Sequence, residues 1–267
     1  MTTALIATAP VAPLQAEPTL KSEQTSQLAF GRVADVLAAQ GDWRQVRCRL
    51  DQYVGWVHLG YAREVELAEA DAWEQAATGW SEGMVADVRE RLIRVPVGGR
   101  VQVDAAGGFT MPGGRKGKLL SGRVVSAEAL AKETRAMPVE KWMVKSFGGA
   151  GYQWGGVTPL GVDCSGLIQT SFAARGVAMP RDSFLQAEVG EPIGREEAKP
   201  GDLFFFSENG RSVTHVAVVG AGDTLVHSTL SAGGFLQEPW GPGTRAAYLN
   251  DFFVGGRRPP RGDGPAL

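Results

Sequence analysis

The chain has 267 residues, with 27 lysines and arginines against 29 aspartates and glutamates, and a formal net charge of −2. This length is enough for two or three compact units, each with a hydrophobic core. The nearly balanced charge excludes a general electrostatic attraction to nucleic acid or to an anionic membrane surface.

The first residues, 1–8, are expected to be a tail that precedes the first domain. They lack a basic segment, and the short apolar run before Pro10 is a poor signal peptide. No later stretch is apolar for long enough to span a bilayer. We therefore expect a cytoplasmic protein with no membrane partner, although export to the cell wall by another route stays open.

Residues 9–62 are predicted to form a small all-β barrel. Strands are expected over 33–37, 46–50 and 53–57, separated by turn residues such as Gly41-Asp42. Trp43 and Trp56 are expected to fill the barrel core. Cys48 is interpreted as a small core residue, far in sequence from Cys164, so both cysteines are expected to be free thiols.

The next two segments have weaker patterns. Residues 63–78 are rich in alanine and glutamate and are interpreted as a helical connector. The segment 97–103 then resembles 30–36 in sequence, which favours a second, degenerate barrel over 79–125.

From residue 126 the pattern changes to helices followed by strands. Helices are expected over 127–135, 139–147 and from Cys164 to about Ala174, with a glycine-rich loop over 148–156. Strands are expected over 203–206, 213–219 and 224–227. Helices followed by an antiparallel sheet indicate an α+β domain over 126–255. The glycine- and proline-rich residues 256–267 are expected to be a disordered tail.

Cys164 has the strongest chemical signal in the chain. Asp163 is a good helix N-cap, and apolar residues at helical spacing follow the cysteine. A thiol at a helix N-terminus lies near free backbone N–H groups, an environment that favours the nucleophilic thiolate. Together with a nearby histidine, such a thiol is the minimum equipment for acyl transfer.

Two of the three histidines follow Cys164 at an informative spacing. Pairing the strands about residue 221 sets His215 opposite His227, with Cβ atoms about 4.5–5.5 Å apart. If His215 is the base that faces Cys164, His227 can hold its other ring nitrogen and set the tautomer.

Residues 126–255 resemble the NlpC/P60 family of cell-wall cysteine peptidases. The matching motifs are Gly151-Tyr152-Gln153-Trp154-Gly155-Gly156, Asp163-Cys164-Ser165-Gly166-Leu167, Pro180-Arg181-Asp182-Ser183, Pro200-Gly201-Asp202-Leu203-Phe204-Phe205, Thr214-His215-Val216-Ala217 and Val226-His227. The resemblance implies a papain-like α+β fold preceded by one or two barrels similar to bacterial SH3 domains.

The resemblance also implies residue roles. Cys164 is the nucleophile, His215 the base and His227 the orienting third residue. The substrate-binding positions are Tyr152, Trp154, Asp163, Ser165 and Ser183. No metal or other cofactor is implied.

Family members with barrels in front hydrolyse the γ-D-glutamyl to diamino acid bond of peptidoglycan stem peptides. In that subgroup an acidic residue and a tyrosine of the first barrel read the free amine of the terminal L-alanine, and Glu23 and Tyr53 are the candidates here. We therefore expect peptidoglycan-derived peptides as partners and a monomeric enzyme.

Three alternatives stay open. The first is a zinc hydrolase that uses Cys164, His215, His227 and Asp163, although the short ligand spacings of such sites are missing. The second is a catalytically inactive wall-binding module. The third is another acyl transfer on the same scaffold, such as a wall amidase or a lipid deacylase.

Overall fold

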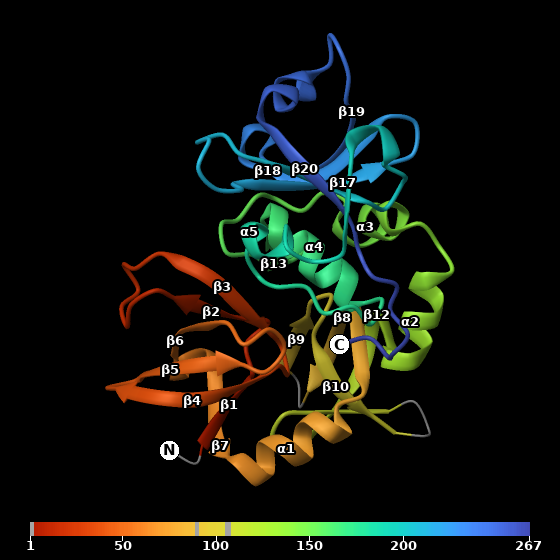
Figure 1. The fold of residues 1–267 in the computed structure, drawn as a ribbon. Coiled ribbons are helices and arrows are strands. Elements are labelled where there is room, and N and C mark those ends of the chain that lie inside the picture. The colour runs from red at the N-terminus through yellow and green to blue at the C-terminus, as the bar shows by residue number, and fades with distance from the viewer. Residues whose placement is uncertain (1–2, 89–90, 105–107) are drawn as a thin grey trace. The chain divides into compact units, whose positions relative to one another are not determined.

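The structure is a computed structural model that describes residues 3–88, 91–104 and 108–267 (Figure 1). The chain divides into two compact units, Met1–Leu130 and Ala131–Leu267. The first unit is almost entirely β-structure, and the second combines helices with an antiparallel sheet. The predicted α+β fold class is confirmed. Within the described residues, every helix is too short or too polar to cross a membrane.

The first barrel is a seven-stranded sheet in the order β3-β2-β6-β5-β4-β1-β7. Its strands are β1 (Thr3–Ala7), β2 (Val11–Gln15), β3 (Gln24–Ala29), β4 (Val33–Gln40), β5 (Trp43–Cys48), β6 (Val54–His58) and β7 (Ala62–Glu66), with the 3-10 helix η1 (Leu59–Tyr61) before β7. Cys48 is buried in its core, as predicted. Trp43 and Trp56 are only half-buried, so their prediction as core residues is wrong: smaller apolar side chains such as Leu14, Val46 and Val57 fill the core.

The N-terminal tail prediction is also wrong for the described residues. Thr3–Ala7 is strand β1, which pairs with β4 on one side and β7 on the other. Leu5 and Ile6 are fully buried. The short apolar run before Pro10 is therefore a core strand, and the barrel extends beyond the predicted range 9–62 at both ends.

The predicted helical connector is part strand and part helix. Its first residues belong to β7, and α1 (Leu67–Ala76) follows. Trp73 of α1 is buried against β1, and its indole N–H donates a hydrogen bond of 2.7 Å to the carbonyl oxygen of Gly31. α1 therefore packs on the first barrel.

A second sheet of five strands, in the order β10-β11-β12-β8-β9, follows α1. Its members are β8 (Gly79–Val88), β9 (Arg91–Val95), β10 (Arg100–Val103), β11 (Phe109–Met111) and β12 (Arg115–Ser126). Since β10 pairs with both β11 and β8, the strands close on themselves around a core that contains Phe30 and Met111. The two segments of similar sequence also touch, because the Arg100 N–H donates to the carbonyl oxygen of Phe30. The prediction that this barrel is of the SH3 type stays a prediction.

The second unit contains a six-stranded antiparallel sheet in the order β15-β20-β16-β17-β18-β19. Its strands are β15 (Glu191–Ile193), β16 (Leu203–Phe206), β17 (His215–Gly220), β18 (Thr224–Thr229), β19 (Gly234–Pro239) and β20 (Phe253–Arg258), and a separate short pair is β13 (Val157–Thr158) and β14 (Gly161–Val162). The helices are α2 (Ala127–Arg135), which begins in the first unit, α3 (Val139–Phe147), α4 (Cys164–Ala173) and α5 (Ser183–Gln186), with the 3-10 helices η2 (Arg195–Glu197), η3 (Leu230–Ala232) and η4 (Arg245–Phe252). α3 and α4 lie along the sheet, and α4 contacts β17 and β18 (Figure 1).

The C-terminal residues are not the disordered tail that their composition predicts. The first of them complete strand β20. Beyond it, the Leu267 N–H donates to the carbonyl oxygen of Ala173, and Ala266 is buried. The last residues therefore pack against the end of α4.

Candidate active site

Cys164 is the first residue of α4, and the loop before it caps the helix. Oδ1 of Asp163 accepts a hydrogen bond of 2.7 Å from the N–H of Gly166, as expected of an N-cap. The Cys164 side chain is buried, with 8% exposure. The backbone N–H groups of Val216 and Ser165 lie close enough to the sulfur to lower the pKa of the thiol. The sulfur therefore lies beside β17, next to the residue that follows His215.

The acidity of this thiol reflects opposing effects. Burial and the Asp163 carboxylate raise the pKa of Cys164 to about 12. The backbone N–H groups of Val216 and Ser165 and the charge of Arg181 lower it, but by less. The helix N-terminus thus favours the thiolate, as expected, but desolvation outweighs it, and a pKa raised to about 12 makes the neutral thiol the resting form.

His215 and His227 are in direct contact, as predicted. Nε2 of His215 lies 2.8 Å from Nδ1 of His227. The predicted strand register is wrong, because Val218 pairs with Val226 and Gly220 with Thr224, two residues away from pairing about residue 221. Asp223 adopts a left-handed φ of 53° and belongs to the turn. A shift of two residues leaves side chains on the same face, so the contact survives as a diagonal one.

The two imidazoles differ in their exposure to solvent. His227 is 1% exposed and His215 is half-buried. Burial and the neighbouring His227 lower the pKa of His215 to about 3. A neutral His215 can accept a proton, which a base requires.

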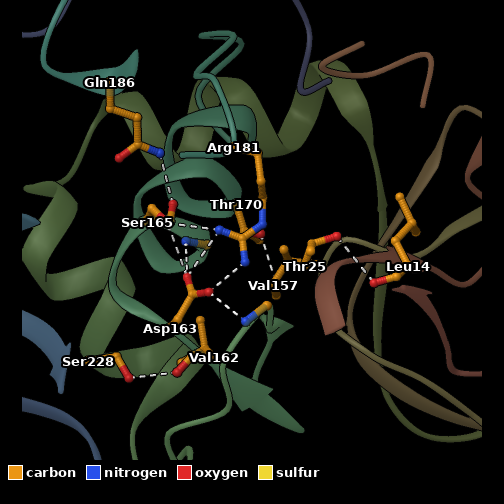
Figure 2. A network of polar contacts seen from close by, with 12 residues as sticks. Leu14, Thr25, Val157, Val162, Asp163, Ser165, Thr170, Arg181, Gln186 and Ser228 are labelled. Carbon is orange, nitrogen blue, oxygen red and sulfur yellow. Dashed lines mark hydrogen bonds and ion pairs between the residues drawn. The ribbon is translucent and has the colours of Figure 1, made fainter. Parts of the chain in front are cut away.

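Asp163 also anchors a buried polar network (Figure 2). Nη2 of Arg181 donates to Oδ2 of Asp163 at 2.6 Å, and Nη1 donates to Oγ of Ser165 at 2.8 Å. The N–H of Gly155 donates to Asp163, and Nε2 of Gln186 donates to the carbonyl oxygen of Ser165. These bonds tie the loop, the start of α4 and the segment around residue 181 together. For Asp163 and Ser165, substrate binding stays a prediction.

The glycine-rich loop brings Tyr152 close to this centre. The Tyr152 N–H donates to the carbonyl oxygen of Gly233, and the side chain is half-buried. Burial, together with the negative charge of Asp163, raises the pKa of the Tyr152 phenol well above its usual range. The phenol therefore remains a proton donor at neutral pH.

Two other predicted binding residues lie in the same unit. Trp154 is 59% exposed at the tip of the glycine-rich loop. Ser183 is buried, and its hydroxyl lies 3.5 Å from the carbonyl oxygen of Val213. Their contacts with a substrate stay predictions.

Glu23 and Tyr53 belong to the first unit. Glu23 is exposed just before β3, and Tyr53 is half-buried against the barrel core before β6. Their predicted role in reading a substrate amine stays a prediction.

His227, one of the residues named for the alternative zinc site, already has hydrogen-bond partners at both ring nitrogens. Both ring nitrogens of His227 are in hydrogen-bond contact, one with His215 and one with Oε1 of Glu238 at 2.8 Å. Within residues 3–88, 91–104 and 108–267, no group of three or more His, Cys, Asp or Glu side chains is arranged to hold a metal ion.

Sequence reasoning missed Glu238 and Arg245. Arg245 donates to both carboxylate oxygens of Glu238, from Nε at 2.8 Å and from Nη2 at 2.5 Å. The strand around Glu238 has no clear alternating pattern, so nothing in the sequence indicated a buried carboxylate beside His227.

Two segments of the chain are similar to known protein families. Residues 149–244 match the model of the NlpC/P60 family, and residues 14–60 match that of the bacterial dipeptidyl-peptidase SH3 domain. Over 84 residues the chain is 39% identical to the gamma-D-glutamyl-L-lysine dipeptidyl-peptidase of Bacillus subtilis (strain 168), which covers 31% of this chain and 28% of that protein. Over 92 residues it is 35% identical to the probable endopeptidase NlpC of Escherichia coli (strain K12), which covers 34% of this chain and 60% of that protein.

The chain thus spans less than two thirds of the length of either relative. A crystal structure of an NlpC/P60 family protein from Bacillus cereus ATCC 10987 matches with a TM-score of 0.78 and 21% identity. The match covers 96% of this chain and 99% of that one. This likeness establishes the fold.

Proposed function

Since the chain contains an NlpC/P60 domain preceded by a bacterial SH3 domain, we propose that it is a cysteine peptidase of peptidoglycan-derived peptides. Its substrate bond is the γ-D-glutamyl to diamino acid bond, with diaminopimelate as the diamino acid. The observation that carries the proposal is the placement of Cys164 at the start of α4, beside β17, together with the His215–His227 contact.

The first step is attack by Cys164 on the γ-glutamyl carbonyl carbon. Because the resting thiol is neutral, its proton passes to Nδ1 of His215 as the sulfur–carbon bond forms. Nε2 of His215 already faces His227, so Nδ1 is the nitrogen left for the thiol. The carbonyl oxygen becomes an oxyanion, which the Cys164 N–H and the Tyr152 phenol stabilise.

The second step releases the diamino acid. His215 gives its proton to the leaving amine as the carbon–nitrogen bond breaks, and a thioester remains on Cys164. Water then gives a proton to His215 and attacks the thioester carbon. The carbon–sulfur bond breaks, His215 returns the proton to the sulfur, and the free γ-carboxyl group loses its proton to solvent. Losing one oxyanion donor in such a site costs about 10²–10³ in rate.

The relatives support the γ-D-glutamyl side of the bond, whereas diaminopimelate as the diamino acid is our own extension. The Bacillus subtilis protein is by name a gamma-D-glutamyl-L-lysine dipeptidyl-peptidase, and the SH3 domain model is that of bacterial dipeptidyl-peptidases. We extend the γ-D-glutamyl specificity and the dipeptidyl-peptidase activity to this chain. In this proposal Glu23 and Tyr53 bind the free amine of an N-terminal L-alanine.

Mass spectrometry of one small peptide tests both the cleaved bond and the requirement for a free N-terminal amine. We expect the enzyme to cleave L-Ala-γ-D-Glu-meso-diaminopimelate into L-Ala-D-Glu and diaminopimelate. The N-acetylated peptide lacks the amine and should be cleaved slowly or not at all. Cleavage of both peptides at equal rates would refute the requirement for a free amine. Cleavage of neither peptide would refute the proposed bond.

A further inference from the structure

The hydrogen bonds of the candidate site continue past the two imidazoles to a buried carboxylate. Nε2 of His227 lies 2.8 Å from Oε1 of Glu238, and Arg245 donates to both oxygens of the same carboxylate. Glu238 is 7% exposed, whereas the Arg245 side chain is 41% exposed. The carboxylate is therefore held between an internal imidazole and a guanidinium that reaches solvent.

His215, His227 and Glu238 come from three neighbouring strands and lie on one diagonal of the sheet. His227 of β18 pairs with Leu236 of β19, and Glu238 lies two residues further along β19, on the same face. The register of β17 and β18 displaces His215 in the opposite direction along the sheet. A straight line across the strands thus runs from His215 through His227 to Glu238.

The ionisation of Glu238 determines the direction of these hydrogen bonds. Burial raises the pKa of its carboxyl group, whereas the hydrogen bonds from His227 and Arg245 lower it. The lowering is the larger effect, so the pKa of Glu238 lies below its usual value. An ionised carboxylate only accepts hydrogen bonds. Nε2 of His227 must therefore carry a proton when it meets Glu238.

The proton on Nε2 of His227 determines the tautomer of the next ring. In neutral His227 the other nitrogen, Nδ1, has a free lone pair and accepts. It faces Nε2 of His215, which must then be the donor. Neutral His215 consequently has its free lone pair on Nδ1, the nitrogen that the proposed function assigns to the Cys164 proton.

We propose that Glu238, oriented by Arg245, is a positioning residue that acts through His227 to make Nδ1 of His215 the base. This inference rests on the proposed function for its link to catalysis. The alternative is a structural role, in which Glu238 and Arg245 only fasten β19 to η4. The two roles differ in whether loss of the carboxylate changes the imidazole tautomers.

Long-range ¹H–¹⁵N NMR of the histidine rings separates the two roles. The full chain has three histidines, and His58 is an internal reference because its Nδ1 accepts from the Gly60 N–H and its Nε2 must carry the proton. Spectra are recorded above pH about 6.5, the ordinary histidine pKa. We expect the wild-type protein to show the Nε2–H tautomer for all three rings.

Glu238→Met removes the acceptor and keeps the side-chain length. A buried N–H without an acceptor costs about 1–3 kcal/mol, so His227 and then His215 should change to the Nδ1–H tautomer. His58 should not change. With L-Ala-γ-D-Glu-meso-diaminopimelate, kcat should fall about 10- to 100-fold, while KM stays within about twofold. Glu238→Gln, whose amide oxygen can still accept, should retain the wild-type tautomers and most of kcat.

Asp202→Asn is the matched control for a structural effect. Asp202 is also a buried carboxylate of the second unit; it is paired with Arg258 at 2.8 Å and accepts a hydrogen bond from the Lys199 N–H. It should lower the melting temperature without changing any tautomer. Unchanged tautomers in Glu238→Met would overturn the positioning role, even if stability falls. If the wild-type protein does not cleave the peptide, the proposed function fails, and the NMR result alone decides the role of Glu238.

Discussion

At the scale of single residues, the reactivity of Cys164 is a balance between opposing neighbours. Burial and the Asp163 carboxylate favour the neutral thiol, whereas Arg181 and two backbone N–H groups favour the thiolate. Burial and the Asp163 carboxylate prevail, and His215, the first residue of β17, is also neutral. The resting site is therefore an uncharged thiol with an uncharged base, and the proton moves only when the sulfur attacks.

This balance predicts how the reaction of Cys164 with iodoacetamide depends on pH. Only the thiolate reacts, and a pKa raised to about 12 leaves it scarce at neutral pH. Between about pH 6 and pH 10 the alkylation rate should rise about tenfold per pH unit, without a plateau. The rate is measured in a Cys48→Ala background, so that a single thiol is followed.

A rate that is flat between about pH 5 and pH 8 would contradict this picture, because it would indicate a preformed thiolate–imidazolium pair. The His215→Gln variant in the same background is the control. It should react with the same pH dependence, because the neutral imidazole does not determine the thiol pKa.

At the scale of elements, the start of α4 depends on a close approach of two backbones. A Cβ on Gly166 would lie 2.0 Å from the carbonyl oxygen of Gly156 in the glycine-rich loop. Glycine is therefore required here for space, not for backbone freedom. The contact joins the helix that carries Cys164 to the loop that carries Tyr152.

Gly166→Ala should destabilise the protein, although alanine is the better helix former by about 1 kcal/mol. Overpacking against a fixed carbonyl oxygen costs about 1–3 kcal/mol, which exceeds the gain in helix propensity. Gly151→Ala is the matched control, because its nearest non-neighbouring atom would be 3.9 Å away and the residue is exposed. Its effect should stay within about 0.5 kcal/mol in urea denaturation. Equal effects of the two variants would contradict the close approach.

The elements also show what sequence can predict. The Asp163 cap and the bounds of α2, α3 and β16 follow from local signals, and the structure agrees. The contact of His215 with His227 was predicted despite a wrong register, because a slip of two residues preserves the face. Glu238 was beyond prediction, since a buried carboxylate contradicts the hydrophobic pattern that identifies strands.

At the scale of the whole molecule, the sequence predicts the order of an all-β unit and an α+β unit, and the structure has that order. The two ends were predicted wrongly for one physical reason. Thr3–Ala7 and Leu267 take their order from partners that are distant in the chain, such as Ala62–Glu66 and Ala173. The composition of a terminal segment does not predict which distant residues it will pair with.

The central claim is that the sulfur of Cys164 performs the chemistry, and the two cysteines of the chain permit a direct measurement. Cleavage of L-Ala-γ-D-Glu-meso-diaminopimelate is followed by mass spectrometry for Cys164→Ala and for Cys48→Ala, with thermal unfolding to verify that both are folded. We predict that Cys48→Ala retains turnover and that folded Cys164→Ala gives no product. Product formation by Cys164→Ala at a rate near that of Cys48→Ala would contradict the account.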